Sequence, residues 1–117
     1  MTDSLKFGTS GLRGLARDLV GPNSARYATA FVEMLVADGR MDRRGTVLVG
    51  RDLRESSPAI SDSVAAAITR CGPTPIDCGE VPTPALALAA LTRGVPAIMV
   101  TGSHIPADRN RLQFYSA

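Results

Sequence analysis

Two segments of this sequence combine residue types that could bind phosphate or activate a hydroxyl group. In the first, Ser103 follows a glycine and precedes His104, the only histidine of the chain. In the second, Ser10 and Arg13 lie among three glycines in residues 8–14. A serine hydroxyl can serve as a nucleophile that forms a covalent intermediate. Glycine-rich backbone lets N–H groups approach an anion, and the guanidinium of arginine matches phosphate geometry.

The residues around Ser103 allow more than one interpretation. With His104 as a base, the pair would resemble part of a hydrolase site. Against this, adjacent loop residues usually point apart, and the Gly-x-Ser-x-Gly elbow of many hydrolases is absent. The alternative is a polar turn in which Ser103 caps a neighbouring group and His104 is exposed. Spacing alone leaves these interpretations open.

The glycine-rich segment 8–14 is equally open on its own. It is not a Walker loop, because no Gly-Lys-Ser or Gly-Lys-Thr follows. An ordinary turn and an anion site both explain three glycines around Arg13.

Composition excludes several classes of protein. The formal net charge of +2 is too small to predict a nucleic-acid or membrane-surface partner. The two cysteines, Cys71 and Cys78, have no metal-site spacing, and a single histidine argues against a zinc site made by this chain. We therefore predict that both are reduced and partly buried. The start has no signal-peptide pattern and the longest apolar run, 85–91, is too short to span a bilayer, so we predict a cytoplasmic protein.

Alternating short apolar runs and helical patterns predict an α/β fold. Ala28, Phe31, Val32 and Leu35 follow helical spacing after Pro22. Ser57 and Thr83 each precede a proline, which predicts that they cap the next two helices. The predicted elements are a helix from 22 to Gly39, a strand at 46–50, a helix from Ser57 to Gly72, a strand at 76–78, a helix at 85–93, a strand at 97–101 and a strand at 112–115.

The order of these elements predicts a three-layer αβα fold with a mostly parallel mixed sheet and right-handed crossovers. The strand at 112–115 is expected at a sheet edge. Ligand sites in open α/β sheets lie at the carboxyl ends of the strands. Two such ends carry polar residues here, at 50–57 and at 101–106.

Five segments, in this order along the chain, together resemble the first domain of the α-D-phosphohexomutase family of phosphomannomutases and phosphoglucomutases. They are residues 7–14, 49–54, 81–85, 101–106 and 108–115. The ordered set covers nearly the whole chain and is more specific than any one member. The resemblance implies that residues 1–117 form the N-terminal α/β domain of a mutase, incomplete at its C-terminal end.

The resemblance also implies a mechanism. A phosphoserine gives its phosphoryl group to a hexose monophosphate, and the bisphosphorylated sugar turns over and returns its other phosphate. Ser103 would be the phosphate carrier and one ligand of Mg²⁺, with aspartates that this chain lacks. His104 would assist proton transfer, and Ser10 and Arg13 would contact the phosphoserine. Arg51 and Arg54 are expected to hold their loop.

The sequence departs from the family at two points. The family continues with Asn-Gly-x-Lys, whose lysine serves in proton transfer, whereas this chain has Arg111 and Gln113. Gln113 cannot act as an acid or base. The family enzyme also has further domains, so we expect this chain alone to be inactive, with the missing mutase domains and a hexose phosphate as partners. The alternative is a stand-alone, non-catalytic domain that binds a phosphosugar or a partner protein.

Overall fold

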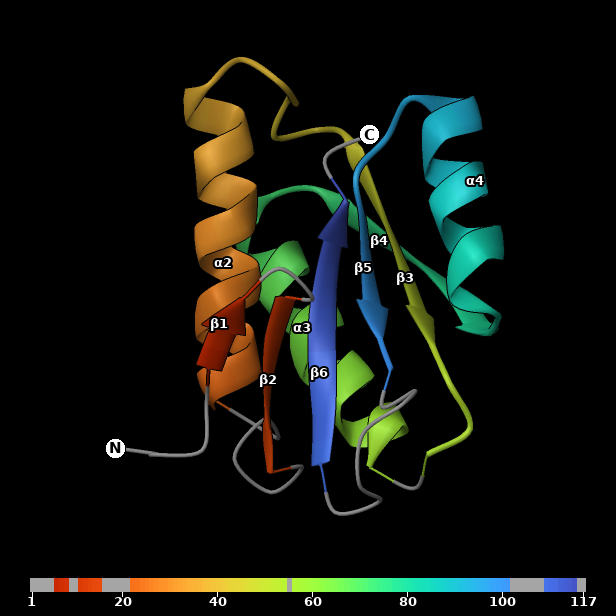
Figure 1. Cartoon of the computed structure of the whole chain (residues 1–117). Helices are drawn as coiled ribbons and strands as arrows, with labels where there is room; N and C mark the ends of the chain where they lie inside the picture. The colour runs from red at the N-terminus through yellow and green to blue at the C-terminus, as the bar shows by residue number, and fades with distance from the viewer. Residues whose placement is uncertain (1–5, 9–10, 16–21, 55, 102–108, 116–117) are drawn as a thin grey trace.

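The computed structural model describes residues 6–8, 11–15, 22–54, 56–101 and 109–115, with side chains from 23 onward except 109–111 (Figure 1). The helices of this part are α2 (Pro22–Ala37), α3 (Ser57–Cys71) and α4 (Thr83–Arg93). The strands are β1 (Lys6–Gly8), β2 (Gly11–Leu15), β3 (Thr46–Arg51), β4 (Thr74–Glu80), β5 (Ala97–Val100) and β6 (Arg109–Tyr115).

The strands form one mixed sheet in the order β1-β2-β6-β5-β3-β4. Strand β3 pairs in parallel with β4 and β5, the strands that the helical crossovers connect. The pairs β5–β6, β6–β2 and β2–β1 are antiparallel. The α/β class is therefore confirmed, and its parallel part lies where strand–helix–strand order predicted it.

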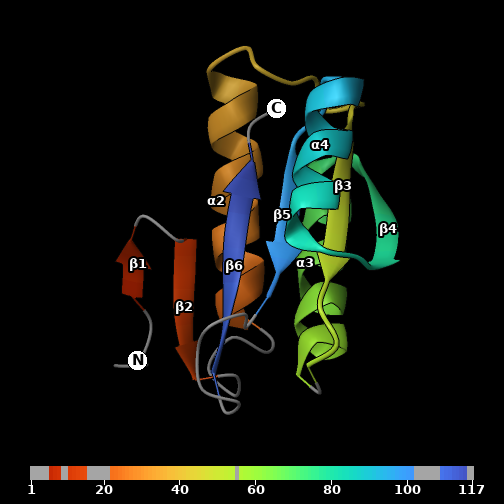
Figure 2. The ribbon, with the colours of Figure 1, turned by 45° about the vertical axis from the view of Figure 1, so that its right-hand side comes forward.

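Helices cover both faces of the sheet, which confirms the three layers. Helices α2 and α3 lie over one face and α4 over the other (Figure 2). Alternating side chains of each strand enter different cores, because successive residues of a strand point to opposite faces. Val49 and Ile98 pack with α2 and α3, whereas Leu48 and Met99 pack with α4.

The helical spacing of the sequence is confirmed by burial. The predicted stripe of α2 is buried, and so are Ile60, Val64, Ala67 and Ile68 of α3. Gly72 and Gly94 follow α3 and α4 with positive φ, a backbone conformation that favours glycine.

The predicted capping residues are wrong by one position. Helix α3 has Ser56 and α4 has Pro82 at the N-cap, and neither makes a side-chain capping bond. Ser57 is instead fully buried in the first turn, where its hydroxyl bonds a carboxylate.

Two further expectations need correction. Strand β6 lies between β2 and β5 and is not at an edge. It is internal because the glycine-rich opening, expected as a loop, supplies strands β1 and β2, and β2 pairs with β6. The strand predicted at 76–78 extends over Thr74–Glu80.

Candidate functional site

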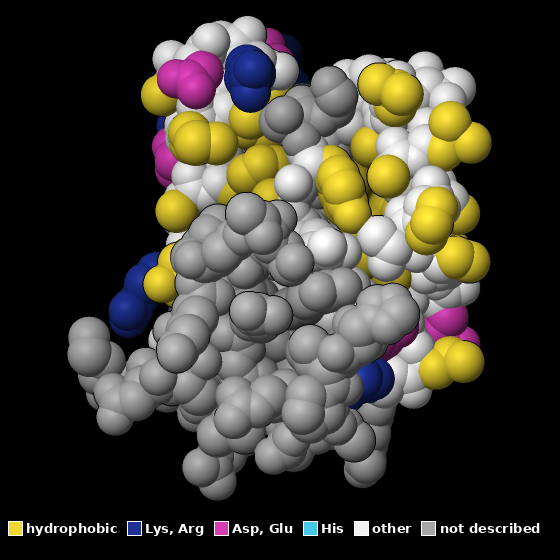
Figure 3. All heavy atoms as spheres, viewed as in Figure 1, with side chains coloured by type: hydrophobic (Ala, Val, Ile, Leu, Met, Phe, Trp, Pro, Cys, Tyr) yellow, Lys and Arg dark blue, Asp and Glu magenta, His cyan; other side chains and the backbone are white. Residues whose placement is uncertain are grey.

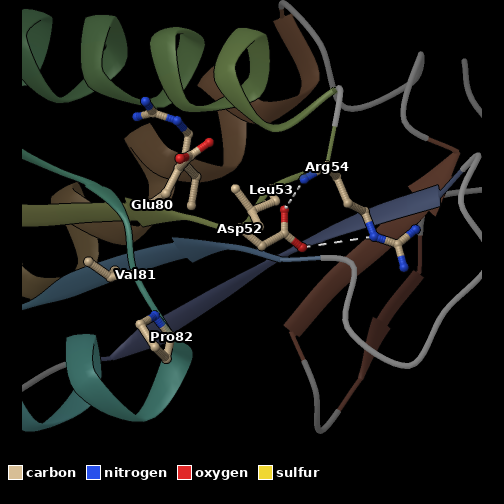
Figure 4. Close-up of a pocket in the computed structure, with 7 residues that line it drawn as sticks. Asp52, Leu53, Arg54, Glu80, Val81 and Pro82 are labelled. Atoms are coloured by element: carbon tan, nitrogen blue, oxygen red, sulfur yellow. Dashed lines mark hydrogen bonds and ion pairs between the residues drawn. The ribbon is translucent and has the colours of Figure 1, made fainter.

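The candidate site lies at the carboxyl ends of the parallel strands. After β3 the chain turns toward α3, and after β4 it turns toward α4 on the opposite face of the sheet. Such a reversal leaves a crevice between neighbouring strands, where α/β proteins bind ligands. A pocket of about 730 Å³ occupies this place (Figure 4). Its lining residues are Arg51, Asp52, Leu53, Arg54, Glu80, Val81 and Pro82.

Asp52 organises the turn after β3. Its Oδ1 accepts hydrogen bonds from the Ser57 hydroxyl at 2.5 Å and from the Arg54 backbone N–H at 3.1 Å. Its own backbone N–H donates to the Val100 carbonyl at 2.9 Å. Val100 ends β5, so Asp52 joins the turn after β3, the start of α3 and the end of β5 in one place. Arg54 Nε lies 3.8 Å from the other carboxylate oxygen (Figure 4).

Arg51 links β3 to β4. Its Nη1 donates to Asp77 Oδ1 at 3.1 Å, and its backbone carbonyl accepts a bond from Val81 N–H at 3.0 Å. Asp77 also accepts from the backbone N–H of Gly79 at 2.8 Å. Arg51 and Arg54 therefore pair with carboxylates of this chain, which agrees with the loop-holding role predicted for them. Arg51 Nε is buried and has no hydrogen-bond partner among the described residues.

The residues predicted to carry the chemistry are placed only in part. Ser10, Ser103 and His104 lie outside the described residues. Thr101 leads into the serine segment, follows the end of β5 and is 2% exposed. The serine segment therefore starts at the carboxyl end of β5, beside the turn that Asp52 organises.

The pairing of β5 with β6 and of β6 with β2 places the backbone of Arg13 at the same edge of the sheet as the end of β5. Val100 pairs with Leu112 of β6, and Leu112 pairs with Leu12 of β2. The next pair outward is Arg13 with Arg111, one step beyond the end of β5. The backbone of Arg13 therefore lies at the level of Thr101, close to the start of the serine segment.

Gln113, the departure from the family pattern, lies within β6 opposite Met99. The Tyr115 hydroxyl donates to its Oε1 at 3.4 Å, and both side chains are partly exposed. The amide thus has a neighbour within its own strand, two residues away. An amide at this place can hold a hydrogen bond but cannot transfer a proton.

Sequence reasoning missed the roles of Asp52 and Ser57. Ser57 was predicted as a cap because it precedes Pro58, yet its hydroxyl reaches back to the acid of the preceding turn. The sequence did contain a signal for this bond. Asp52 stands between a buried strand and a helix start, and Asp side chains in such turns often accept hydrogen bonds from nearby residues.

A magnesium site is not completed by the side chains that the structure describes. Among them, no three His, Cys, Asp or Glu residues come together. Of the acids near the pocket, Asp52 bonds Ser57 and Asp77 bonds Arg51, and Glu80 is the third acid at this place. The described residues therefore do not fit Mg²⁺ as a ligand set. Cys71 and Cys78 are free and partly buried, as predicted.

None of the helices in the described part of the chain has the length and apolar character needed to span a bilayer.

Comparison with known proteins places the chain in a family. Residues 4–117 match the family described as "Phosphoglucomutase/phosphomannomutase, alpha/beta/alpha domain I". A phosphomannomutase of Sinorhizobium fredii is 59% identical over 94% of this chain and 23% of its own length. A phosphoglucosamine mutase of Rhodococcus erythropolis is 37% identical over 95% of this chain and 25% of its own length.

A solved structure is similar in fold as well as in sequence. The crystal structure of a phosphoglucomutase/phosphomannomutase family protein from Burkholderia thailandensis superposes with a TM-score of 0.76 at 31% identity. The match covers 93% of this chain and 25% of that one. The chain thus spans about a quarter of the length of the relatives it matches. By its motifs, its three-layer fold and these matches, the chain belongs to the phosphoglucomutase/phosphomannomutase family and corresponds to its α/β/α domain I.

Proposed function

We propose that this chain is the phosphoserine-bearing part of a phosphohexomutase, which interconverts hexose 6-phosphate and hexose 1-phosphate through a bisphosphorylated sugar. The observation that carries the proposal is the strand register. It brings the backbone of Arg13 to the carboxyl edge of β5, from which the segment with Ser103 departs. A phosphate on that segment would be close to a strand that carries a permanent cation.

In the proposed reaction, phosphorylated Ser103 loses its phosphoryl group to a hydroxyl of the hexose phosphate. The O–P bond to serine breaks as the O–P bond to the sugar forms, and the serine oxygen receives the proton that the sugar hydroxyl gives up. The bisphosphorylated sugar then returns its other phosphate to Ser103. His104 would assist the proton transfer, and Ser10 and Arg13 would bind the phosphoserine. Positioning and charge neutralisation do most of the work in phosphoryl transfer.

Charge along the sheet supports an anionic ligand. Lys6 pairs with Arg13 and Arg13 pairs with Arg111, so three basic residues occupy one row across β1, β2 and β6. Basic residues at paired positions of neighbouring strands favour an anionic ligand such as a phosphate.

The proposed metal contribution of this chain is limited to Ser103. Mg²⁺ prefers phosphate and carboxylate oxygens, and it would help neutralise the transferred group. The phosphoserine would give one ligand, and the others would come from outside this chain. The remaining mutase domains and the hexose phosphate are accordingly the proposed partners, and we expect the isolated chain to be inactive and cytoplasmic.

A second candidate function, a non-catalytic phosphosugar-binding or partner-binding domain, is favoured by Gln113. Losing a positioned proton-transfer group costs roughly 10²–10⁴ in rate. The pair of changes Gln113→Lys and Arg111→Gly would raise turnover if the first proposal holds. Unchanged turnover would remove the proton-transfer role from position 113.

A chimera tests the proposal. This chain would replace the matched 23% of the Sinorhizobium fredii phosphomannomutase, to which it is 59% identical. Conversion of mannose 6-phosphate to mannose 1-phosphate, followed by ³¹P NMR, is expected for the chimera and not for its Ser103→Ala variant. Ser63→Ala is the matched control, since Ser63 lies within α3 and its hydroxyl donates to the Ala59 carbonyl of the same helix at 3.2 Å. Equal turnover with Ser103→Ala would refute the phosphocarrier role.

A further inference from the structure

The outer face of α4 is apolar. We define this face by Pro84, Ala85, Leu88 and Leu91, which are all exposed. Leu88 is 63% and Leu91 69% exposed. Their spacing places them on one side of the helix, since residues three and four apart are neighbours on a helix surface. The opposite side packs on the sheet through Leu86 and Ala90, so α4 is apolar on both sides.

Charge is missing from this surface. Between Glu80 and Arg93 the sequence has no Asp, Glu, Lys or Arg. Figure 3 shows hydrophobic side chains over α4, whereas charged side chains gather over the upper end of α2. A helix that is hydrophobic all round is normally buried.

Beside α4, the described helices leave part of this face of the sheet without a helix. α4 packs on β3 and β5, and no described helix lies over β6 on that side in either ribbon view (Figures 1 and 2). Gln113 and Tyr115 of β6 lie on this face and are partly exposed.

Two observations indicate what covers the outer face of α4. Two leucines and two small residues on an 11-residue helix offer far less than the about 800 Å² per partner that a stable dimer buries. Packing within one polypeptide needs less area, because it does not lose the translational freedom of a second molecule. About three quarters of each matched relative lies outside the stretch that this chain covers.

We propose that the outer face of α4 is the docking surface for the rest of the mutase, whose contacting surface is uncharged and apolar. The inference rests on the proposed function only in that this chain works as part of a larger mutase. The surface lies on the outer side of α4, which begins directly after Pro82 of the pocket lining. It would hold domain I in place without contributing a group to the reaction.

Amide hydrogen exchange of α4 is the test, measured on the 117-residue chain and on the chimera described above. The backbone N–H groups of 83–93 are expected to exchange several-fold more slowly in the chimera. Leu88→Gln with Leu91→Gln should remove that protection and lower the chimera's unfolding temperature by several degrees, with little effect on the chain alone. Leu91→Gln alone should give a smaller shift in the same direction.

The control is Met34→Gln, at an apolar side chain of α2 that is 49% exposed. It should leave both proteins unchanged. Equal exchange of α4 in the two proteins would overturn the proposal. So would light scattering that shows the chain alone as a dimer which the double variant converts to a monomer, because the occupant would then be a second copy.

The outcome is separable from that of the proposed function. Protection of α4 does not require turnover, so it should persist in the Ser103→Ala chimera. A chimera that protects α4 yet carries no phosphate on Ser103 would refute the phosphocarrier role and leave the docking surface standing.

Discussion

The two faces of the sheet differ in how completely this chain covers them. On one face, α2 and α3 bury side chains of β3, β5 and β6, including Val47, Ile98 and Leu112. On the other face, α4 is the described helix that packs on Leu48 and Met99, and its outer side is apolar. Among the described residues, the first face has the larger buried core, and the second face is the one on which we propose that further packing occurs.

The helices on the two faces also differ in the hydrogen bonds at their ends. α3 is tied to the candidate site through Ser57 and Asp52, and at its other end it meets the Arg43 segment. α4 begins at Thr83 after the N-cap Pro82, which lines the pocket and makes no side-chain capping bond. Both helices therefore border the site, and α3 is the one that a side-chain hydrogen bond ties to it.

The largest expected difference between the two faces is the loss in free energy of unfolding when a core leucine is shortened. Leu35→Ala on the two-helix face should lower the free energy of unfolding by about 3–5 kcal/mol, because a fully enclosed site cannot collapse around the lost side chain. Leu86→Ala beneath α4 should cost about 2–3 kcal/mol, since one helix can shift toward the sheet. Urea unfolding of the two variants measures both. An equal or larger loss for Leu86→Ala would contradict the division between the faces.

The second largest difference is expected between the glycines that follow α3 and α4, in the stability lost when each is replaced by alanine. An added Cβ at Gly72 would lie 2.9 Å from the Arg43 carbonyl oxygen, while at Gly94 it would meet no atom within 4 Å among the described residues. Gly94→Ala should cost about 1–2 kcal/mol for the positive φ alone. Gly72→Ala should cost more, because the backbone at Arg43 must move as well. Thermal unfolding of the two variants measures this. Equal losses would show that the backbone at Arg43 can move without a cost in stability.

A smaller difference in stability loss is expected between substitutions at the first residues of α3 and α4. Ser57→Ala should cost about 1.5 kcal/mol, because Asp52 loses the hydrogen bond of a buried hydroxyl. Thr83→Ala, at the first residue of α4, should stay within about 0.5 kcal/mol. Chemical denaturation of both variants is the measurement. A Thr83→Ala loss as large as that of Ser57→Ala would show that α4 is anchored in a way that its hydrogen bonds do not reveal.

The smallest effect is electrostatic. Arg43 Nη2 donates to Glu33 Oε1 at 2.6 Å on the α2 side, and this hydrogen bond lowers the pKa of the Glu33 carboxyl. A lowered folded-state pKa stabilises the protein above the carboxyl's ordinary pKa, and this contribution disappears as pH falls through the folded-state value. Glu33→Gln should therefore lower the urea midpoint slightly at pH 7 and not at pH 3. Both groups are well exposed, so high salt should remove the difference.

Much of the fold could be predicted because its signals are local. Helical spacing located α2 and α3, the Thr83–Pro84 start signal located α4, and short apolar runs located β3 and β5. The hairpin of β1 and β2 could not be predicted, because three glycines weaken any strand pattern and the pairing partner, β6, is about a hundred residues away. The internal position of β6 was missed for the same reason.

For the site, sequence predicted polar turns at the carboxyl ends of β3 and β5, and it did not predict the bonding within the turn after β3. The carboxyl ends of β3 and β5 follow from strand order, which is a general property of α/β folds. The bond from Ser57 to Asp52 depends on how the turn folds back, and a capping pattern predicted a different partner. The roles of Ser10, Arg13, Ser103 and His104 rest on the family and stay predictions.

The phosphocarrier role of Ser103 is tested most directly by mass spectrometry of the chimera after incubation with mannose 1,6-bisphosphate. The account predicts one added phosphate that maps to the peptide containing Ser103. It also predicts that the phosphate is lost when mannose 6-phosphate is supplied and is absent from the Ser103→Ala variant. A phosphate on another residue, or an unmodified protein that still converts mannose 6-phosphate, would contradict it.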